Sequence, residues 1–187
     1  MPLKKILGRL GRERPARLLY RRIVEQARQP SFYAVLGVPD TVNGRFDMIT
    51  LHAFLLFERL GREKDEKNAA LAQEVFDEMF LDMDHNLREM GVSDVSVGKK
   101  VRRMAEIFYG RLSAYREALK SAGDDALRDA LRRNIYGGVE APEGALAELA
   151  AYVRTADAML RRMADRQLRK GEVSFPPAPA KEQANER

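Results

Sequence analysis

The stretch FDEMFLDMDHNLREM, residues 76–90, decides the fold class of this chain. Its apolar side chains recur in steps of four and three residues, at Phe76, Phe80, Met83, Leu87 and Met90. Such steps place side chains on one face of an α-helix, which completes a turn in about 3.6 residues. The stretch therefore predicts an amphipathic helix over residues 65–90, ended by the glycine at position 91.

The same periodicity continues on both sides of this stretch. It predicts further helices over residues 15–28, 43–60, 99–121, 124–136 and 142–170, with a loop over residues 92–98. No run of alternating apolar and polar residues predicts a strand. We therefore expect an all-α fold, a bundle of five to six helices.

The 187 residues fit one domain with two extensions. We expect a basic N-terminal segment over residues 1–14, a helical domain over residues 15–171 and a flexible tail over residues 172–187. The tail prediction depends on the sequence FPPAPA, which begins at Phe175 and is followed by polar residues.

The composition excludes several classes of site. The chain has no cysteine, which excludes disulfides, zinc–thiolate sites, iron–sulfur clusters and cysteine nucleophiles. It has no glycine-rich phosphate loop and no nucleophile-elbow sequence. No apolar run approaches the roughly 18 residues of a membrane-spanning helix. Because the N-terminus also lacks the apolar region of a secretory signal, we expect an intracellular protein.

Charge is distributed unevenly along the chain, although the net charge is only +5. Residues 1–30 contain nine lysines and arginines against two glutamates, and residues 99–120 form a second basic block. The cations Lys4, Lys5, Arg9 and Arg12 alternate with leucines and an isoleucine. This pattern predicts binding to an anionic membrane surface; contacts to RNA phosphates and a cleavable presequence are the alternatives.

The two histidines are candidate metal ligands. Asp82 and His85 are three residues apart, the spacing of one half of a di-iron site, but His52 has no carboxylate at that spacing. The simpler interpretation places His52 in or beside the core, hydrogen-bonded to a neighbour, and His85 on an acidic surface. The methionines at positions 79, 83, 90 and 104 fit either core packing or a methionine-rich groove for a client protein.

Three blocks of sequence resemble a known family. They are NGRFDMITLH at residues 43–52, FDEMFLDMDHNLREMGVSD at residues 76–94, and VGKKV with FYGR and Tyr115 between residues 97 and 115. In this order and spacing they are similar to the ubiquinol–cytochrome c chaperone family, the assembly factors of respiratory complex III. The short N-terminus resembles a bacterial member.

The resemblance implies a non-enzymatic all-α chaperone with no catalytic residue, cofactor or metal. Mitochondrial members are associated with newly made cytochrome b and with its translation at the ribosome, together with a small partner protein. We therefore expect cytochrome b or its precursor as the client and the ribosome as a further candidate partner. We expect a peripheral position at the inner face of the cytoplasmic membrane, or on the matrix side in a eukaryote, and no sequence-specific nucleic acid.

The resemblance also supplies candidate site residues. They are Gly44, Arg45, Phe46, Asp47, His52, Asp82, Asp84, Arg88, Glu89, Gly91, Asp94, Gly98, Lys99, Lys100, Tyr109, Gly110 and Arg111. We expect the four glycines at turns or close contacts. We expect the three arginines to pair with Asp47, Asp84 and Asp94, which would either lock the helices together or contact the client.

Two functions from other classes remain open at this point. A ribosome- or RNA-binding protein would use the basic N-terminal segment and the block over residues 99–120, with steeply salt-sensitive binding. A metal-dependent helical enzyme would need a site around His52 or His85. The order of the three blocks favours the assembly chaperone.

Overall fold

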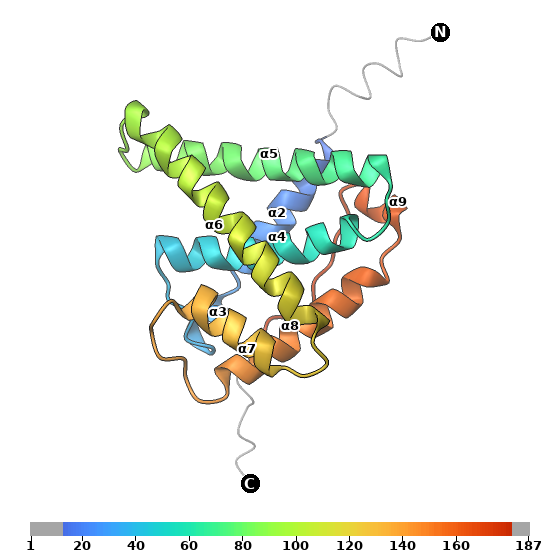
Figure 1. Ribbon diagram of the computed structural model, residues 1–187. Coiled ribbons are helices and arrows are strands. Elements are labelled where there is room, and N and C mark those ends of the chain that lie inside the picture. The colour runs from blue at the N-terminus through green and yellow to red at the C-terminus, as the bar shows by residue number, and fades with distance from the viewer. Residues whose placement is uncertain (1–12, 181–187) are drawn as a thin grey trace.

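The structure, a computed structural model, describes residues 13–180 of the chain, and every regular element in this range is a helix (Figure 1). In chain order the elements are α2 (Pro15–Ala27), α3 (Pro30–Ala34), α4 (Val42–Leu60), α5 (Glu66–Glu89), α6 (Asp94–Lys120), α7 (Asp125–Leu131), the π-helix η1 (Arg132–Tyr136), α8 (Ala145–Arg161) and α9 (Asp165–Leu168). The all-α prediction is confirmed, although short elements such as α3 and α9 make the helices more numerous than expected. None of the helices within residues 13–180 is both long enough and apolar enough to span a membrane.

Helix α4 is the central element of the bundle. Helices α2, α5, α6, α8 and η1 all pack against it. Its middle, MITLHAFLL at residues 48–56, contains only two polar residues, Thr50 and His52, and both are fully buried. A helix that is apolar on every side is stable only when the rest of the domain encloses it.

His52 is a core residue, as the simpler interpretation predicts. Its Nδ1 lies 2.8 Å from the carbonyl oxygen of Met48, and its Nε2 lies 2.8 Å from the hydroxyl of Tyr152. Burial lowers the pKa of His52 to about 4, so the ring is neutral at pH 7. A carbonyl can only accept, which assigns the ring proton to Nδ1 and makes Nε2 the acceptor for Tyr152.

Helices α5 and α6 form a long hairpin whose turn extends past the rest of the bundle, at the upper left of Figure 1. Gly91 has a positive φ of 79° in this turn, where other residues would be strained. The predicted loop over residues 92–98 is wrong, because α6 already begins at Asp94. The alternation of valine and serine hid a helical spacing, since the buried Val97 lies four residues before Val101.

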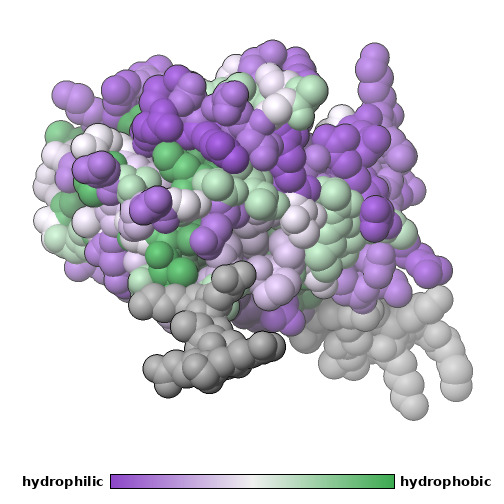
Figure 2. All heavy atoms as spheres, turned by 90° about the horizontal axis from the view of Figure 1, so that it is seen from below, coloured by the Kyte–Doolittle hydropathy of each residue, from purple (hydrophilic) through white to green (hydrophobic). Residues whose placement is uncertain are grey.

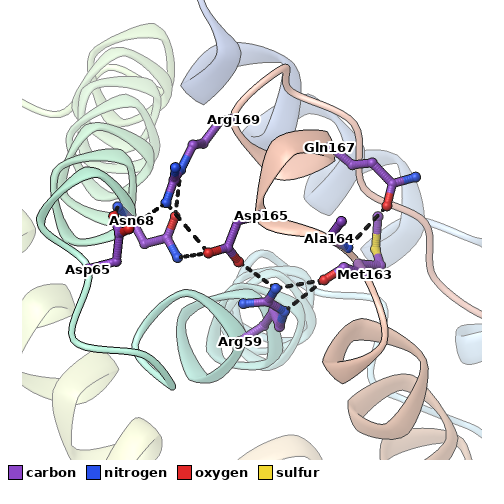
Figure 3. A network of polar contacts seen from close by, with 8 residues as sticks. All are labelled: Arg59, Asp65, Asn68, Met163, Ala164, Asp165, Gln167 and Arg169. Atoms are coloured by element: carbon purple, nitrogen blue, oxygen red, sulfur yellow. Dashed lines mark hydrogen bonds and ion pairs between the residues drawn. The ribbon is translucent and has the colours of Figure 1, made fainter.

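The C-terminal third differs from the expected single helix over residues 142–170. Helix α8 ends at Arg161, and α9 begins only at Asp165. The side chain of Arg59, from the end of α4, explains the break (Figure 3). Its Nη2 donates to the carbonyl oxygen of Met163 over 2.6 Å and to the carboxylate of Asp165 over 2.5 Å. The arginine thus binds a carbonyl that a continuous helix would use internally.

The same carboxylate holds α9 against the start of α5 (Figure 3). Asn68 donates to Asp165 over 2.9 Å and accepts from Arg169 over 3.0 Å. Arg169 also forms an ion pair of 2.8 Å with Asp65, the residue that caps α5. This network is structural, since it connects the ends of α4, α5 and α9.

The expected flexible tail is wrong for residues 172–180. Val173 is buried, and the ring of Phe175 packs edge-on against His52 with a centroid separation of 5.2 Å. Gln26 of α2 donates to the carbonyl oxygen of Pro176 over 2.9 Å. The prolines do not prevent packing, because an extended segment can bury alternate side chains without internal hydrogen bonds. Residues 1–12 and 181–187 lie outside the described range, and the domain boundary at residue 14 stays a prediction.

Candidate functional site

An apolar groove opens between α2, α4, α5 and α6. It has a volume of about 220 Å³ and draws its walls from all four helices. Its lining residues are Tyr20, Arg28, Val42, Arg45, Phe46, Ile49, Asp82, Met83, Asn86, Leu87, Met90 and Met104. Most of these residues are apolar, and the charged ones are Arg28, Arg45 and Asp82. The groove can therefore hold an apolar segment of another molecule.

The first turn of α4 positions the aromatic wall of the groove. Thr41 caps the helix, because its hydroxyl accepts from the backbone N–H of Gly44 over 3.1 Å. A Cβ at Gly44 would lie 1.9 Å from the carbonyl oxygen of Pro39, so only glycine lets the loop approach this closely. This close approach sets where α4 begins and thus where Phe46 and Ile49 face the groove.

A buried ion pair supports Phe46 from α6. Arg111 donates to the carboxylate of Asp47, and its guanidinium lies 5.7 Å from the centre of the Phe46 ring. Burial raises the pKa of Asp47 to about 6, even though the charge of Arg111 opposes that shift. The pair joins α6 to α4 and holds the aromatic side chain between them.

Methionines and an exposed valine complete the lining of the groove. Met83 is buried and Met104 is half-buried, whereas Met90 is 59% exposed and Val42 is 60% exposed. The unbranched methionine side chain adapts its shape to different partners. Figure 2 shows that, on the face seen from below, hydrophobic residues gather in patches among hydrophilic ones. Met90 and Val42 are thus part of a limited set of large apolar side chains that meet solvent.

Most polar side chains at the rim of the groove form hydrogen bonds or ion pairs with neighbouring polar side chains. Tyr20 donates to Asp82 over 2.7 Å, and burial together with this carboxylate raises the pKa of Tyr20. Arg45 binds Asp40 through two nitrogens, at 2.6 and 3.2 Å. The hydrogen bond from Arg45 in turn lowers the pKa of Asp40. These contacts hold the rim in one arrangement.

The family model described as ubiquinol-cytochrome C chaperone matches residues 34–175, which include the groove residues of α4, α5 and α6. The chain belongs to the ubiquinol–cytochrome c chaperone family. Two curated proteins named ubiquinol-cytochrome c reductase complex assembly factor 1 are similar to it. The one from Xenopus laevis is 27% identical over 73% of this chain and 67% of its own length. The one from Drosophila melanogaster is 25% identical over 84% of this chain and 65% of its own length.

A solved structure agrees with this family. It is described as the crystal structure of the Cbp3 homolog from Brucella abortus, and it is 39% identical to the chain. The two superpose with a TM-score of 0.81, covering 95% of this chain and 97% of the other. The chain thus spans nearly all of this relative, but only about two thirds of the two animal proteins.

The structure of this ubiquinol–cytochrome c chaperone brings some of the predicted site residues together. Arg45, Phe46 and Asp82 line the groove, and Gly44, Asp47 and Arg111 position it. His52 lies in the core beneath, with no exposed surface. The pairing of Arg111 with Asp47 agrees with expectation, whereas Arg45 pairs with Asp40, which was not anticipated, because both lie around the first turn of α4.

A second set of the predicted residues lies around the turn of the α5–α6 hairpin. Arg88 donates to Asp84 over 2.6 Å and also to Asp94, which ties the two helices together. Glu89 pairs with His85, which is an exposed surface residue as expected. Lys99 and Lys100 are exposed on α6.

Two of the predicted glycines do not serve the expected purpose in the chaperone. A Cβ at Gly98 or Gly110 would meet nothing within 4 Å, and both residues lie within α6 rather than at a turn. Tyr109, on the same helix, is 58% exposed and stacks on Phe76. Lys4, Lys5, Arg9 and Arg12, predicted to meet a membrane, lie outside the described residues.

Sequence reasoning missed part of the groove. Tyr20 and Arg28 come from α2, far from the signature blocks, and no local pattern marked them. For the methionines, core packing and a client groove were both open: Met79 lies in the core, whereas Met83, Met90 and Met104 line the groove. Within residues 13–180, no group of three or more histidine, aspartate or glutamate side chains could hold a metal ion. Both ring nitrogens of His52 are already used by Met48 and Tyr152.

Proposed function

We propose that this chaperone binds newly made cytochrome b, or its precursor, in the groove between α2, α4, α5 and α6. The observation that carries the proposal is the apolar lining of the groove, with Met90 and Val42 more than half exposed at its edge. A membrane protein exposes long apolar segments before it is assembled, and such segments need a partner that covers them. The two curated relatives are named as assembly factors of the ubiquinol–cytochrome c reductase complex, which fits a client from that complex.

We further propose that the chaperone works without catalysis at the surface of the membrane into which its client inserts. In a bacterium this would be the inner face of the cytoplasmic membrane, and in a mitochondrion the matrix side of the inner membrane. Lys4, Lys5, Arg9 and Arg12 would contact anionic lipids there. Binding to vesicles that contain phosphatidylglycerol, and loss of that binding when the four cations become glutamine, tests this part.

Site-specific photo-cross-linking tests the groove. A photoreactive amino acid is placed at Met90 in one sample and at Val139 in another, since the two side chains are 59% and 57% exposed. Each tagged protein is irradiated in membranes of its own organism, and its adducts are identified by mass spectrometry. We expect cytochrome b adducts from position 90 and none from position 139. Equal adducts from both positions, or none from either, would contradict the proposal.

A matched pair of substitutions measures the apolar contribution. Met90→Asp should reduce recovery of cytochrome b by roughly tenfold, because burying a methionine side chain contributes about 1.5–3 kcal/mol. Val139→Asp, at a similarly exposed position outside the groove, should leave recovery unchanged.

One observation favours the alternative of a ribosome- or RNA-binding protein. Lys99, Lys100 and Arg102 are all exposed on α6, and within residues 13–180 none of them has an ion-pair partner. Under this alternative, the capture experiment recovers ribosomal proteins or RNA without cytochrome b. Changing the three cations to glutamate would then abolish recovery and reduce its dependence on salt.

A further inference from the structure

Arg28 lies at the one place where three surface depressions meet. It lines the apolar groove, a depression beside α3 that also contains Tyr33 and Asp40, and a third depression between α2 and α5. Among residues 13–180, no other residue lines all three. Arg28 directly follows α2, where a cation is favoured because the exposed carbonyls at a helix C-terminus carry partial negative charge.

The other charged side chains of these depressions already have partners. In the groove, Asp82 accepts from Tyr20 and Arg45 binds Asp40. Between α2 and α5, the ion pairs are Glu13 with Arg17 and Arg21, Arg14 with Glu78, and Asp84 with Arg88, and the Nε2 of His85 lies 3.4 Å from a carboxylate oxygen of Glu89. Arg28 has no ion pair and no side-chain hydrogen bond to any residue of the range 13–180.

We propose that Arg28 binds a carboxylate of the client, an aspartate or glutamate within the apolar segment that occupies the groove. This inference rests on the proposed function and names the chemistry of its client segment. A guanidinium offers two parallel N–H donors that match the two oxygens of a carboxylate. The adjoining wall of Met83, Leu87 and Met90 requires that the residues around this carboxylate be apolar. An ion pair with Arg28 thus fixes the position of the client segment along a groove that otherwise contacts only apolar side chains.

A zero-length cross-link identifies the carboxylate. Arg28→Lys keeps the charge and introduces an amine that a carbodiimide joins to a carboxylate in direct contact, whereas arginine does not react. The variant is treated with carbodiimide in membranes of its own organism, and the products are mapped by mass spectrometry. We expect one new amide that joins position 28 to an aspartate or glutamate of cytochrome b, absent from the wild-type sample.

Recovery of cytochrome b with charge variants provides the second readout. Arg28→Glu should lower recovery by roughly tenfold or more, because it replaces a charge-assisted hydrogen bond by repulsion, and Arg28→Gln by less. Arg22→Glu is the matched control. It lies on the same helix and is exposed, but it pairs with Glu25 and lines none of the three depressions. The Arg22→Glu variant should recover as much cytochrome b as the wild type.

The outcomes separate this inference from the proposed function. If the wild type recovers no cytochrome b, the proposed function fails, and the inference fails with it. If the wild type recovers cytochrome b but Arg28→Glu recovers as much, or the new amide joins position 28 only to this chain, the inference alone is overturned. If Arg28→Glu instead loses binding to phosphatidylglycerol vesicles with unchanged recovery, Arg28 faces lipid and the inference is likewise wrong.

Discussion

Arg111 and Asp47 form an ion pair that joins α6 to α4 directly behind Phe46, a wall of the groove. Their side chains are only 17% and 10% exposed, so each charge depends on the other. The contact therefore couples the stability of the helix bundle to the shape of the groove.

Removing one partner of this pair should destabilise the protein strongly. We expect Arg111→Met to lower the free energy of unfolding by about 3 kcal/mol, because it leaves the Asp47 carboxylate buried without its counter-charge. The double substitution Arg111→Met with Asp47→Leu should recover a large part of that loss. Urea denaturation of the two variants and the wild type measures the difference. A double variant less stable than Arg111→Met would contradict the explanation.

Two glycines should respond in opposite directions to the same substitution. Gly44→Ala should destabilise the protein by about 3 kcal/mol or more, because the added Cβ meets the Pro39 carbonyl at 1.9 Å. Gly110→Ala lies in open space within α6 and should stabilise it by about 0.5–1 kcal/mol, since alanine is the better helix former. Thermal and urea unfolding of the two variants provide the comparison.

Acid should unfold the protein partly through His52. The pKa of His52 is about 4 in the folded protein, below its ordinary value of 6.5, so unfolding takes up a proton. The stabilisation is present above pH 6.5 and is lost as pH falls towards 4, by at most about 1.4 kcal/mol per pH unit. Free energies of unfolding at several pH values, for the wild type and His52→Gln, check this. The wild-type curve should fall more steeply between pH 6.5 and 4.

The network in Figure 3 should stabilise α9 and the segment that follows it. Arg59→Ala removes the donors to Met163 and Asp165, and we expect a loss of about 2–3 kcal/mol, because the Met163 carbonyl loses its side-chain donor and Asp165, which keeps Asn68 and Arg169, loses its contact to α4. Amide hydrogen exchange should then rise in α9 and the segment after it, before it rises in α4. Arg62→Ala, at an exposed arginine just after the end of α4, is the control. Uniform exchange over all helices would mean that the network has no local effect.

The sequence predicted the elements whose stability is determined by their own periodicity. The apolar steps of α4 lie on a buried face, and those of α5 lie on a face that is buried at Met83 and partly buried at Phe76 and Phe80. Both helices begin and end within a residue or two of expectation. The break after α8 was not predictable, because it depends on Arg59, more than 100 residues earlier in the chain. The apolar side chains after α8 continue the helical spacing, so the local sequence does not show that Arg59 interrupts the helix.

The groove was predictable only in part for a similar reason. Its α4 and α5 walls belong to the sequence blocks that resemble the family, and the methionine spacing indicated an apolar surface. Its α2 wall depends on how α2 crosses α5, which places Tyr20 beside Asp82. No local pattern encodes a contact between residues 62 positions apart.

The packing of residues 172–180 has a consequence for how the chain folds as it is made. Gln26 and Pro176 lie 150 positions apart, so the first described helix finds one of its partners only after 150 further residues have been synthesised. At about 5–20 residues per second, α2 waits roughly 8–30 s for that partner. Contacts so distant in sequence also slow folding itself, because closing a long loop costs chain entropy before the contact compensates for it. Until residue 176 has been made, a nascent chain therefore holds α2 without its contact to the C-terminal segment.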